Sequence, residues 1–199
     1  MFTGIIKNLG VVKDISENSL TIKTEDKEFL NIDLGTSVAV DGVCLTVREI
    51  QENKLIFQIS NESKNRSIIK GYKDNVSVNL ELPTTVKDFL SGHIVQGHVD
   101  EISEVLDITE DKKDLWTFEF NSNNSKYLVD KGSVTINGVS LTVVNPNKHS
   151  FKVAVIDETY KRTNFQFLQA DSQVNIEYDI ISKYVERLII DNWHKWNNK

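Results

Sequence analysis

Two stretches of the sequence repeat one pattern of polar side chains. AVDGVCLTVR occupies residues 39–48 and TINGVSLTVV occupies residues 135–144. In each, a thiol or hydroxyl stands at every second position: Cys44 and Thr46 in the first stretch, Ser140 and Thr142 in the second. Alternate side chains of a strand point to the same face. The pattern therefore predicts two equivalent polar faces, which suit one type of ligand held in two chemically distinct ways.

These motifs also have a simpler structural interpretation, which stays open. The dipeptides Asp41-Gly42 and Asn137-Gly138 are typical of tight hairpin turns, in which both residues have positive φ. Such a hairpin helps to close a barrel whether or not a ligand binds. If the valines and leucines that follow face a core, however, the thiol and hydroxyls face solvent or a ligand.

A second candidate for chemistry is SGHIVQGHVD at residues 91–100, which contains His93 and His98. A glycine precedes each imidazole and permits close approach of backbone or ligand. Imidazole is the usual proton-transfer group near neutral pH, and we expect His98 to be a general acid or base. The alternative is a histidine that is merely satisfied within the connection between domains. Two histidines are too few for a metal site, so none is expected.

A third repeated pair is NESKNRS at 61–67 and DETYKRT at 157–163. Glu62 matches Glu158, and Arg66 matches Arg162. Each segment follows a strand-like run and offers hydroxyl and backbone groups near the polar strands. A solvated turn inherited by both halves is an equally good interpretation.

Composition excludes several function classes. The chain has 199 residues, a net charge of −6 and one cysteine. A negative net charge argues against a general nucleic-acid surface, and a lone thiol cannot form an internal disulfide. No apolar run approaches the ~20 residues that span a bilayer, and the start MFTGIIKNLG lacks the long apolar stretch of a signal peptide. We therefore expect a cytoplasmic protein without a membrane partner.

The elements that position these residues come from an internal duplication. VSVNLEL at 76–82 matches SQVNIEY at 172–178, and VKDIS at 12–16 resembles VLDIT at 105–109. With the two motifs above, four matched blocks occur in the same order in both halves. A repeat this long is typical of two small homologous domains rather than of a solenoid.

Each half reads as β-structure. Short runs rich in Val, Ile, Thr and Phe, partly alternating with polar residues, predict strands in a sandwich or closed barrel. In the first half they occupy 19–24, 37–42, 44–50, 54–60 and 75–82, and in the second half 114–120, 133–138, 140–145, 150–156 and 173–179.

The end of the chain differs and predicts a helix. Apolar residues recur at helical spacing, and either Ser182 or Asp179 could cap the helix. No sequence remains to cover this stripe, which indicates packing on another subunit. The stripe consists of Ile181, Tyr184, Val185, Leu188, Ile189 and Trp193.

Six motifs in order, MFTGII, DGVCLTV, GHIVQGHVD, INGVSLTV, the paired ExxxRS/ExxxRT and KYVERL, resemble the α-chain type of riboflavin synthase. The resemblance covers nearly the whole chain, from Met1 to about Leu188. It implies an all-β fold of two tandem six-stranded Greek-key barrels followed by a C-terminal α-helix. The implied domains are lumazine-binding barrels at 1–88 and 89–180, and a trimerisation helix and tail at 181–199.

The resemblance also implies an activity. Riboflavin synthases convert two molecules of 6,7-dimethyl-8-ribityllumazine into riboflavin and 5-amino-6-(ribitylamino)uracil, a four-carbon transfer that needs no cofactor or metal. Two copies of one substrate would explain two similar halves. The implied assembly is a homotrimer with each site between the N-barrel of one subunit and the C-barrel of its neighbour, and an association with lumazine synthase is a further expectation.

Carried over by motif position, the resemblance assigns Cys44, His98, Ser140 and Thr142 to catalysis. It assigns substrate contacts to Gly4, Ile5, Ile6, Leu45, Thr46, Gln58, Ile59, Ser60, Asn61, Glu62, Ser63, Gly97 and Val99, and in the C-barrel to Lys131, Leu141, Ala154, Val155, Ile156, Asp157, Glu158 and Thr159.

Asn137 departs from the resemblance, because riboflavin synthases usually carry Asp there, so a carboxylate role at this position is in doubt. Two other classes of protein compete with the enzyme. Lumazine or flavin antenna proteins share the double barrel but bind a chromophore without converting it. A purely structural duplicated barrel would leave the polar faces unexplained.

Overall fold

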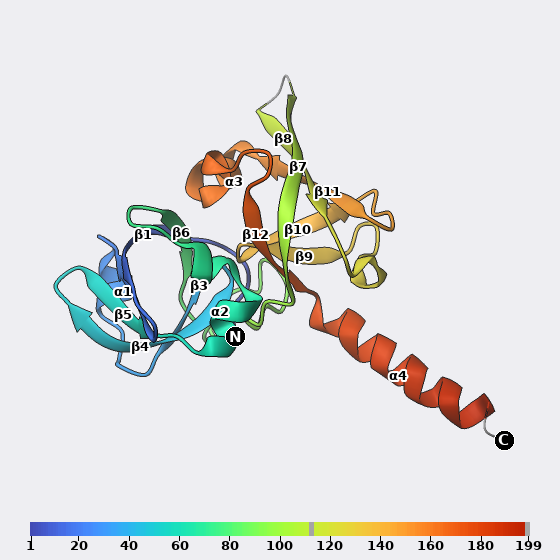
Figure 1. Cartoon of the computed structure of the whole chain (residues 1–199), viewed down its shortest axis with the longest axis horizontal. Helices are drawn as coiled ribbons and strands as arrows, with labels where there is room; N and C mark the ends of the chain where they lie inside the picture. Colours follow the sequence, from blue (N-terminus) through green and yellow to red (C-terminus); the bar gives the residue numbers. More distant parts are fainter. Residues whose placement is uncertain (112–113, 198–199) are drawn as a thin grey trace.

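The first half of the chain forms a closed, six-stranded antiparallel barrel (Figure 1). The computed structural model describes residues 1–111 and 114–197, with side chains to residue 190. The strands lie around the first barrel in the order β1-β2-β5-β4-β3-β6. Their bounds are β1 (Asn8–Ile15), β2 (Ser19–Lys23), β3 (Ser37–Val40), β4 (Val43–Gln51), β5 (Lys54–Gln58) and β6 (Ser77–Glu81).

The second half repeats this barrel with the same connectivity, in the order β10-β11-β8-β7-β12-β9. In each barrel three consecutive strands are neighbours, and the strands before and after them in the chain lie on either side, which makes two overlapping Greek keys. The expected all-β duplicated fold is confirmed. The strands are β7 (Glu101–Asp111), β8 (Leu115–Asn121), β9 (Ser133–Ile136), β10 (Val139–Val144), β11 (Ser150–Ile156) and β12 (Gln173–Tyr178).

Short helices lie on the connections between strands. The repeated ExxxRS/ExxxRT segments form α2 (Asn61–Arg66) and α3 (Asp157–Arg162) rather than irregular turns. An ion pair at i,i+4 spacing supports each of them: Arg66 with Glu62, and Arg162 with Glu158. The remaining short elements are α1 (Lys27–Leu30), η1 (Ile68–Gly71), η2 (Ser125–Tyr127) and η3 (Asn164–Phe167).

The duplicated hairpin motif has the predicted geometry. Asp41 and Gly42 have φ values of 43° and 76°, and Asn137 and Gly138 have values of 45° and 79°. In β4, Val43, Leu45 and Val47 are buried in the barrel core, whereas Cys44 is half-buried and Thr46 is exposed. The two turns abut, since a Cβ on Gly42 would lie 2.7 Å from the backbone nitrogen of Gly138. The alternating burial in β4 shows that the face with Cys44 and Thr46 is directed away from the core of its own barrel.

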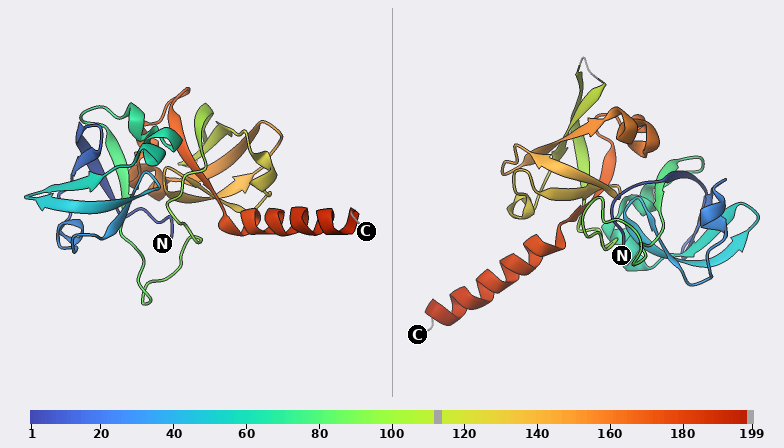
Figure 2. Two further views of the ribbon diagram at one scale, coloured as in Figure 1. Left: turned by 60° about the horizontal axis from the view of Figure 1, so that its bottom comes forward. Right: turned by 180° about the vertical axis from the view of Figure 1, so that it is seen from behind.

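The two halves exchange short segments. The N-terminal segment places Ile6 in the core of the second barrel, whereas Val99, from the second half, packs against the core of the first. Phe2 and Val95 join these segments through two backbone hydrogen bonds, of 2.7 and 3.1 Å. Figure 2 shows the connection after β6 (green) leaving the first barrel as a loop before it returns between the barrels. Each barrel is thus completed by residues of the other half.

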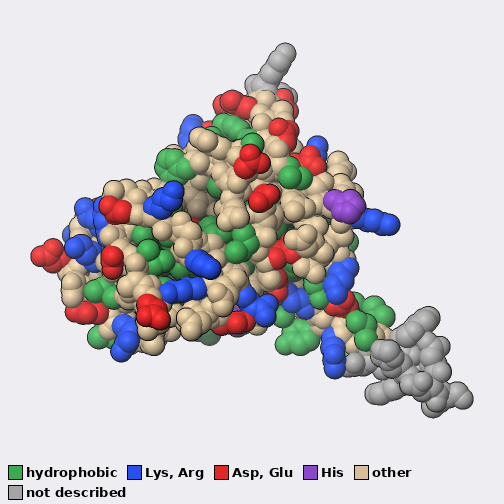
Figure 3. All heavy atoms as spheres, in the orientation of Figure 1, with side chains coloured by type: hydrophobic (Ala, Val, Ile, Leu, Met, Phe, Trp, Pro, Cys, Tyr) green, Lys and Arg blue, Asp and Glu red, His purple; other side chains and the backbone are tan. Residues whose placement is uncertain are grey.

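The last element is α4 (Ile180–Asn197), which extends away from both barrels (Figures 1 and 2). Asp179 caps it by accepting the backbone N–H of Ile181 at 3.0 Å. Its apolar stripe is uncovered, with Ile181, Tyr184, Val185, Leu188 and Ile189 between 49% and 64% exposed. Figure 3 shows apolar side chains at the surface where α4 begins. The side chain of Trp193 lies outside the described residues.

Within residues 1–111 and 114–197, none of the helices combines the length and the apolar character that a membrane span requires.

Candidate functional site

The first barrel carries a cavity of about 530 Å³ that collects residues far apart in the sequence. Its size falls in the usual range for small-molecule sites. Six of the residues expected to bind or transform a ligand line it: Cys44, Glu62, Ser63, Gly97, His98 and Val99.

Cys44 and His98 line the same cavity because the connection between the barrels lies against β4. The backbone N–H of Cys44 donates to the carbonyl of Gly97 at 2.9 Å. Gly97 has φ of +80°, and a Cβ there would stand 2.6 Å from the Cβ of Cys44. Only glycine permits this approach. His98 follows directly and its side chain is exposed at the cavity.

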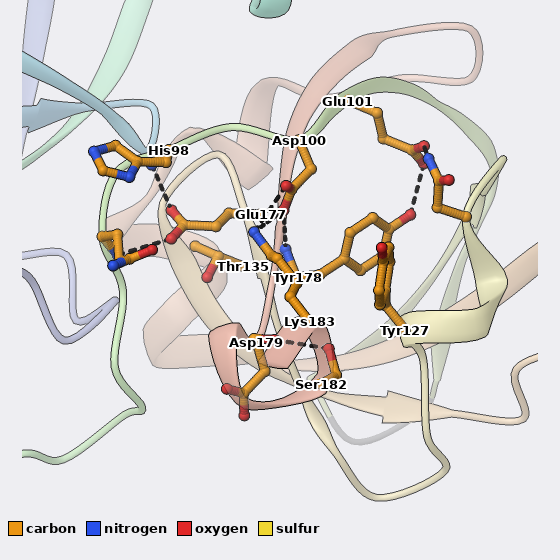
Figure 4. A network of polar contacts seen from close by, with 12 residues as sticks. His98, Asp100, Glu101, Tyr127, Thr135, Glu177, Tyr178, Asp179, Ser182 and Lys183 are labelled. Atoms are coloured by element: carbon orange, nitrogen blue, oxygen red, sulfur yellow. Dashed lines mark hydrogen bonds and ion pairs between the residues drawn. The ribbon is translucent and has the colours of Figure 1, made fainter. Parts of the chain in front are cut away.

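A buried carboxyl of the second barrel holds this connection (Figure 4). Glu177, in β12, accepts the backbone N–H of Gln96 at 2.8 Å, of Gly97 at 2.9 Å and of His98 at 3.1 Å. Burial raises the pKa of the Glu177 carboxyl, and these N–H groups oppose the rise. Beside it, Lys183 forms an ion pair with Asp100, so the first turn of α4 also borders the cavity.

The second barrel places Ser140 at the position that Cys44 has in the first. Its backbone N–H donates to the carbonyl of Gly4 at 2.8 Å. Glu81 in β6 accepts the backbone N–H groups of Thr3 at 2.7 Å and of Gly4 at 3.0 Å. Burial also raises the pKa of Glu81. The arrangement therefore mirrors that of Glu177, Gly97 and Cys44.

His93, to which the sequence assigned no role, belongs with Ser140 and Thr142 to a second half-site, as Cys44 and His98 belong to the first. Nδ1 of His93 lies 2.7 Å from Oγ of Ser140, and Nε2 of the same ring lies 3.2 Å from Oγ1 of Thr135. Burial lowers the pKa of His93, although the carboxylate of Asp179 opposes this. A neutral imidazole between two hydroxyls can accept a proton from one of them. The glycine before His93 was the sequence signal that could have indicated this contact. A Cβ at Gly92 would lie 3.0 Å from the Ser140 hydroxyl, so the absence of a side chain there permits the close approach.

The other expected contact residues divide by exposure. Across β4 and β5, Thr46 pairs with Gln58, which extends the polar face beyond Cys44. Side chains that are exposed or partly buried belong to Ile5, Thr46, Gln58, Ser60, Asn61, Lys131, Leu141, Thr142, Ala154, Ile156, Asp157, Glu158 and Thr159. Those of Ile6, Leu45, Ile59 and Val155 lie in the barrel cores and leave only backbone groups for a ligand.

Asn137 lies at the seam between the barrels. Its Oδ1 accepts the backbone N–H of Asn175 at 2.8 Å, as Oδ1 of Asp41 accepts that of Asn79 at 2.7 Å. The amide oxygen thus makes the same contact as the carboxylate oxygen, but the buried Nδ2 of Asn137 has no hydrogen-bond partner among the described residues. Burial raises the pKa of Asp41 to about 7, and the hydroxyl of Tyr72, which donates to its Oδ2 at 2.7 Å, opposes the rise.

Comparison with known proteins places this architecture in a family. Residues 3–83 and 96–179 each match the lumazine binding domain. Riboflavin synthase of Actinobacillus pleuropneumoniae is 36% identical over 194 residues, which cover 96% of this chain and 90% of that protein. Riboflavin synthase of Schizosaccharomyces pombe is 32% identical over 206 residues, covering 100% and 99%. The chain belongs to the riboflavin synthase family.

Solved structures agree with this family assignment. The chain resembles LumP in its crystal structure with riboflavin, with a TM-score of 0.82 and 25% identity over 89% of this chain and 99% of that one. It also resembles LumP with 6,7-dimethyl-8-(1'-D-ribityl) lumazine, at a TM-score of 0.80 and 26% identity over 89% and 98%. The two domain matches contain β1–β6 and β7–β12 respectively. Each barrel of this riboflavin synthase family member is therefore one lumazine binding domain.

Proposed function

We propose that this protein is a riboflavin synthase that converts two molecules of 6,7-dimethyl-8-ribityllumazine into one riboflavin and one 5-amino-6-(ribitylamino)uracil. The observation that supports this proposal most is that each barrel has a half-site with a thiol or hydroxyl and a histidine. Cys44 and His98 line the first, and the Ser140 hydroxyl lies 2.7 Å from the His93 ring in the second. A chain that only bound one chromophore would not need reactive groups in both.

The reaction needs a base and a nucleophile, and the half-sites offer both. One lumazine must lose a proton from its acidic C7 methyl group, and the other must accept a nucleophile that later leaves. We assign the exposed imidazole of His98 to proton transfer. A thiol at Cys44, or a hydroxyl at Ser140 whose proton His93 accepts, is a suitable nucleophile or hydrogen-bond donor. Thr142 and Thr46 extend the two polar faces.

Positioning supplies a large part of the rate in this proposal. Two reactive molecules held in register lose little further entropy on the way to the transition state. The remaining residues assigned by motif to substrate binding would contact the ring and ribityl chain.

We further propose a cytoplasmic homotrimer, assembled through α4, with lumazine synthase as a candidate partner. The exposed apolar stripe of α4 supports assembly of this kind, since uncovered apolar surfaces mark interfaces. In a trimer the first half-site of one chain would face the second half-site of its neighbour. The domain limits 1–88, 89–180 and 181–199 remain part of this proposal.

Incubation of the purified protein with 6,7-dimethyl-8-ribityllumazine tests the function. The assay is run with and without EDTA to test whether a metal ion is needed. In the part of the chain that the structure describes, no three His, Cys, Asp or Glu residues cluster for metal binding. We expect riboflavin to form at the same rate with and without EDTA. The matched control is Cys44→Ala combined with Ser140→Ala. Binding without conversion over hours would favour an antenna protein.

A further inference from the structure

Each half-site is held by a buried glutamate of the opposite barrel. Glu177 belongs to β12, yet it holds residues 96–98 against β4, and Glu81 belongs to β6, yet it holds residues 3 and 4 against β10. Glu177 is 3% exposed and Glu81 is 4% exposed, so water does not compete for these contacts. Both are strand residues at equivalent places in the duplicated blocks.

The path from Glu177 to the reactive thiol is short and continuous. Its Oε2 accepts the N–H of Gly97, and the carbonyl of Gly97 accepts the N–H of Cys44. The same Oε2 accepts the N–H of His98. One carboxyl therefore fixes the backbone on which His98 stands and the glycine that lies against Cys44. Gly97 lies so close to Cys44 that a displaced connection would change the surroundings of the thiol.

We infer that Glu177 is a positioning residue for the Cys44 and His98 half-site, acting through the backbone of residues 96–98. Glu81 has the same function for Ser140, through Thr3 and Gly4. The inference rests on the proposed function for its effect on turnover, but not for its effect on the geometry of Cys44.

Glutamine is the informative substitution. In Glu177→Gln one oxygen remains an acceptor, but the other is replaced by an NH2 group that faces an N–H donor. Part of the clamp is therefore lost while volume is preserved. Glu81→Gln makes the same change in the other clamp and is the matched control, because Glu81 accepts hydrogen bonds from Thr3 and Gly4 instead of from the connection beside Cys44.

Three readouts separate positioning from a general loss of stability. Cys44 is the chain's only cysteine, so its alkylation rate with iodoacetamide reports on this half-site alone. The imidazole resonances report His98 and His93 separately. In steady-state kinetics, a misplaced reacting group lowers kcat more than it raises KM.

We expect Glu177→Gln to change the alkylation rate of Cys44 severalfold and to shift the His98 resonance. It should lower kcat about 10- to 100-fold with KM within about twofold. Glu81→Gln should leave the alkylation rate unchanged and shift the His93 resonance instead. If Glu177→Gln only lowers the melting temperature, with kcat, alkylation and the His98 resonance unaltered, the glutamate is merely structural and the inference is wrong.

Amide hydrogen exchange of the unmodified protein decides the matter even if the variant does not fold. The N–H groups of Gln96, Gly97 and His98 should exchange slowly, because each must leave the buried carboxyl first. Rapid exchange at all three would overturn the inference. Alkylation and exchange need no lumazine, so they remain interpretable if the protein proves not to be a riboflavin synthase.

Discussion

At the position shared by Cys44 and Ser140, the two halves carry different chemistry in the same local geometry. Each residue donates its backbone N–H to a glycine carbonyl, Cys44 to Gly97 of the connecting segment and Ser140 to Gly4 of the N-terminal segment. Only Ser140 also has an imidazole at hydrogen-bonding distance from its side chain. The halves have therefore diverged in side-chain chemistry rather than in backbone structure.

Replacement of the thiol tests this divergence. We expect Cys44→Ala to lower kcat more than it raises KM, because an interaction made mainly in the transition state is lost. Steady-state kinetics with the lumazine, beside the isosteric Cys44→Ser, measure this. An unchanged kcat in Cys44→Ala would leave the thiol with only the structural role of its hairpin.

The contact between Ser140 and His93 predicts non-additive kinetics. Ser140→Ala and His93→Gln should each reduce kcat, and the double variant should be little worse than the poorer single variant, since both remove one interacting unit. Kinetics of the four proteins in a double-mutant cycle give the coupling. Effects that simply add would show that the two side chains act independently.

The sequence predicted which side chains of the strands point away from the core, but it could not predict which residues those side chains contact. The alternation of Val43, Cys44 and Leu45 fixes the outward face from local geometry alone. The partner of Ser140 depends on an N-terminal segment and a connecting segment that cross between barrels. No periodicity records such long-range placement, so His93 was not selected.

At the scale of elements, the paired hairpin turns at the seam differ in one group. Asp41 and Asn137 occupy equivalent buried positions, and only the first can ionise. Its carboxyl also accepts the Tyr72 hydroxyl and the side-chain amide of Asn164. Three hydrogen bonds therefore do not fully compensate the burial of a negative charge, since the pKa is still raised.

This difference predicts a pH-dependent stability. Asp41 has an ordinary pKa of 3.8 when unfolded and about 7 when folded, so the native state binds its proton more tightly. The resulting stability is present at low pH and is lost as pH rises from about 4 through about 7. The difference corresponds to about 4 kcal/mol at most.

Asp41→Asn should abolish this loss, because the neutral amide copies Asn137 and can donate to the oxygen of Tyr72. We expect the free energy of unfolding of the variant, relative to the parent, to increase between pH 4.5 and pH 8. Urea unfolding at several pH values measures it, with Asn137→Asp as the converse variant. A difference that does not vary with pH would contradict a titrating Asp41.

Most strands were predictable from their alternation, including β4, whose register shifts between Val47 and Glu49, but two other strands with register shifts were not. All five strand-like runs in each half form strands, but β1 and β7 were not identified. The register of each shifts, between Val12 and Asp14 in β1 and between Val105 and Asp107 in β7. A bulge adds a residue and breaks the two-residue period. The six-residue helices α2 and α3 are likewise too short for a helical period.

At the scale of the whole molecule, α4 extends from the barrels and the described part of its apolar stripe is uncovered. Full burial of each large apolar side chain in its stripe contributes roughly 1.5–3 kcal/mol. Most helical stability in proteins comes from packing of an apolar face, which supports the proposal that α4 contacts other copies. The helix was predictable from the helical spacing of its apolar residues, whereas its direction relative to the barrels was not predictable from the sequence.

Removal of α4 should separate assembly from folding. A chain that ends at Tyr178 retains every strand of both barrels. We expect it to stay folded as a monomer, to bind the lumazine weakly and to lose most turnover, because the proposed trimer would no longer bring half-sites of different subunits together. Sedimentation with a parallel activity assay measures this, and Leu188→Glu with Ile189→Glu in the full chain is the control. A fully active monomer would place the complete site within one chain.

The stoichiometry of conversion tests the central claim, that two lumazines react across two equipped half-sites. Chromatography of a completed reaction should show two molecules of 6,7-dimethyl-8-ribityllumazine consumed for each riboflavin formed, with one 5-amino-6-(ribitylamino)uracil released. Lumazine that is bound but recovered unchanged, or riboflavin formed without the pyrimidine product, would contradict the account.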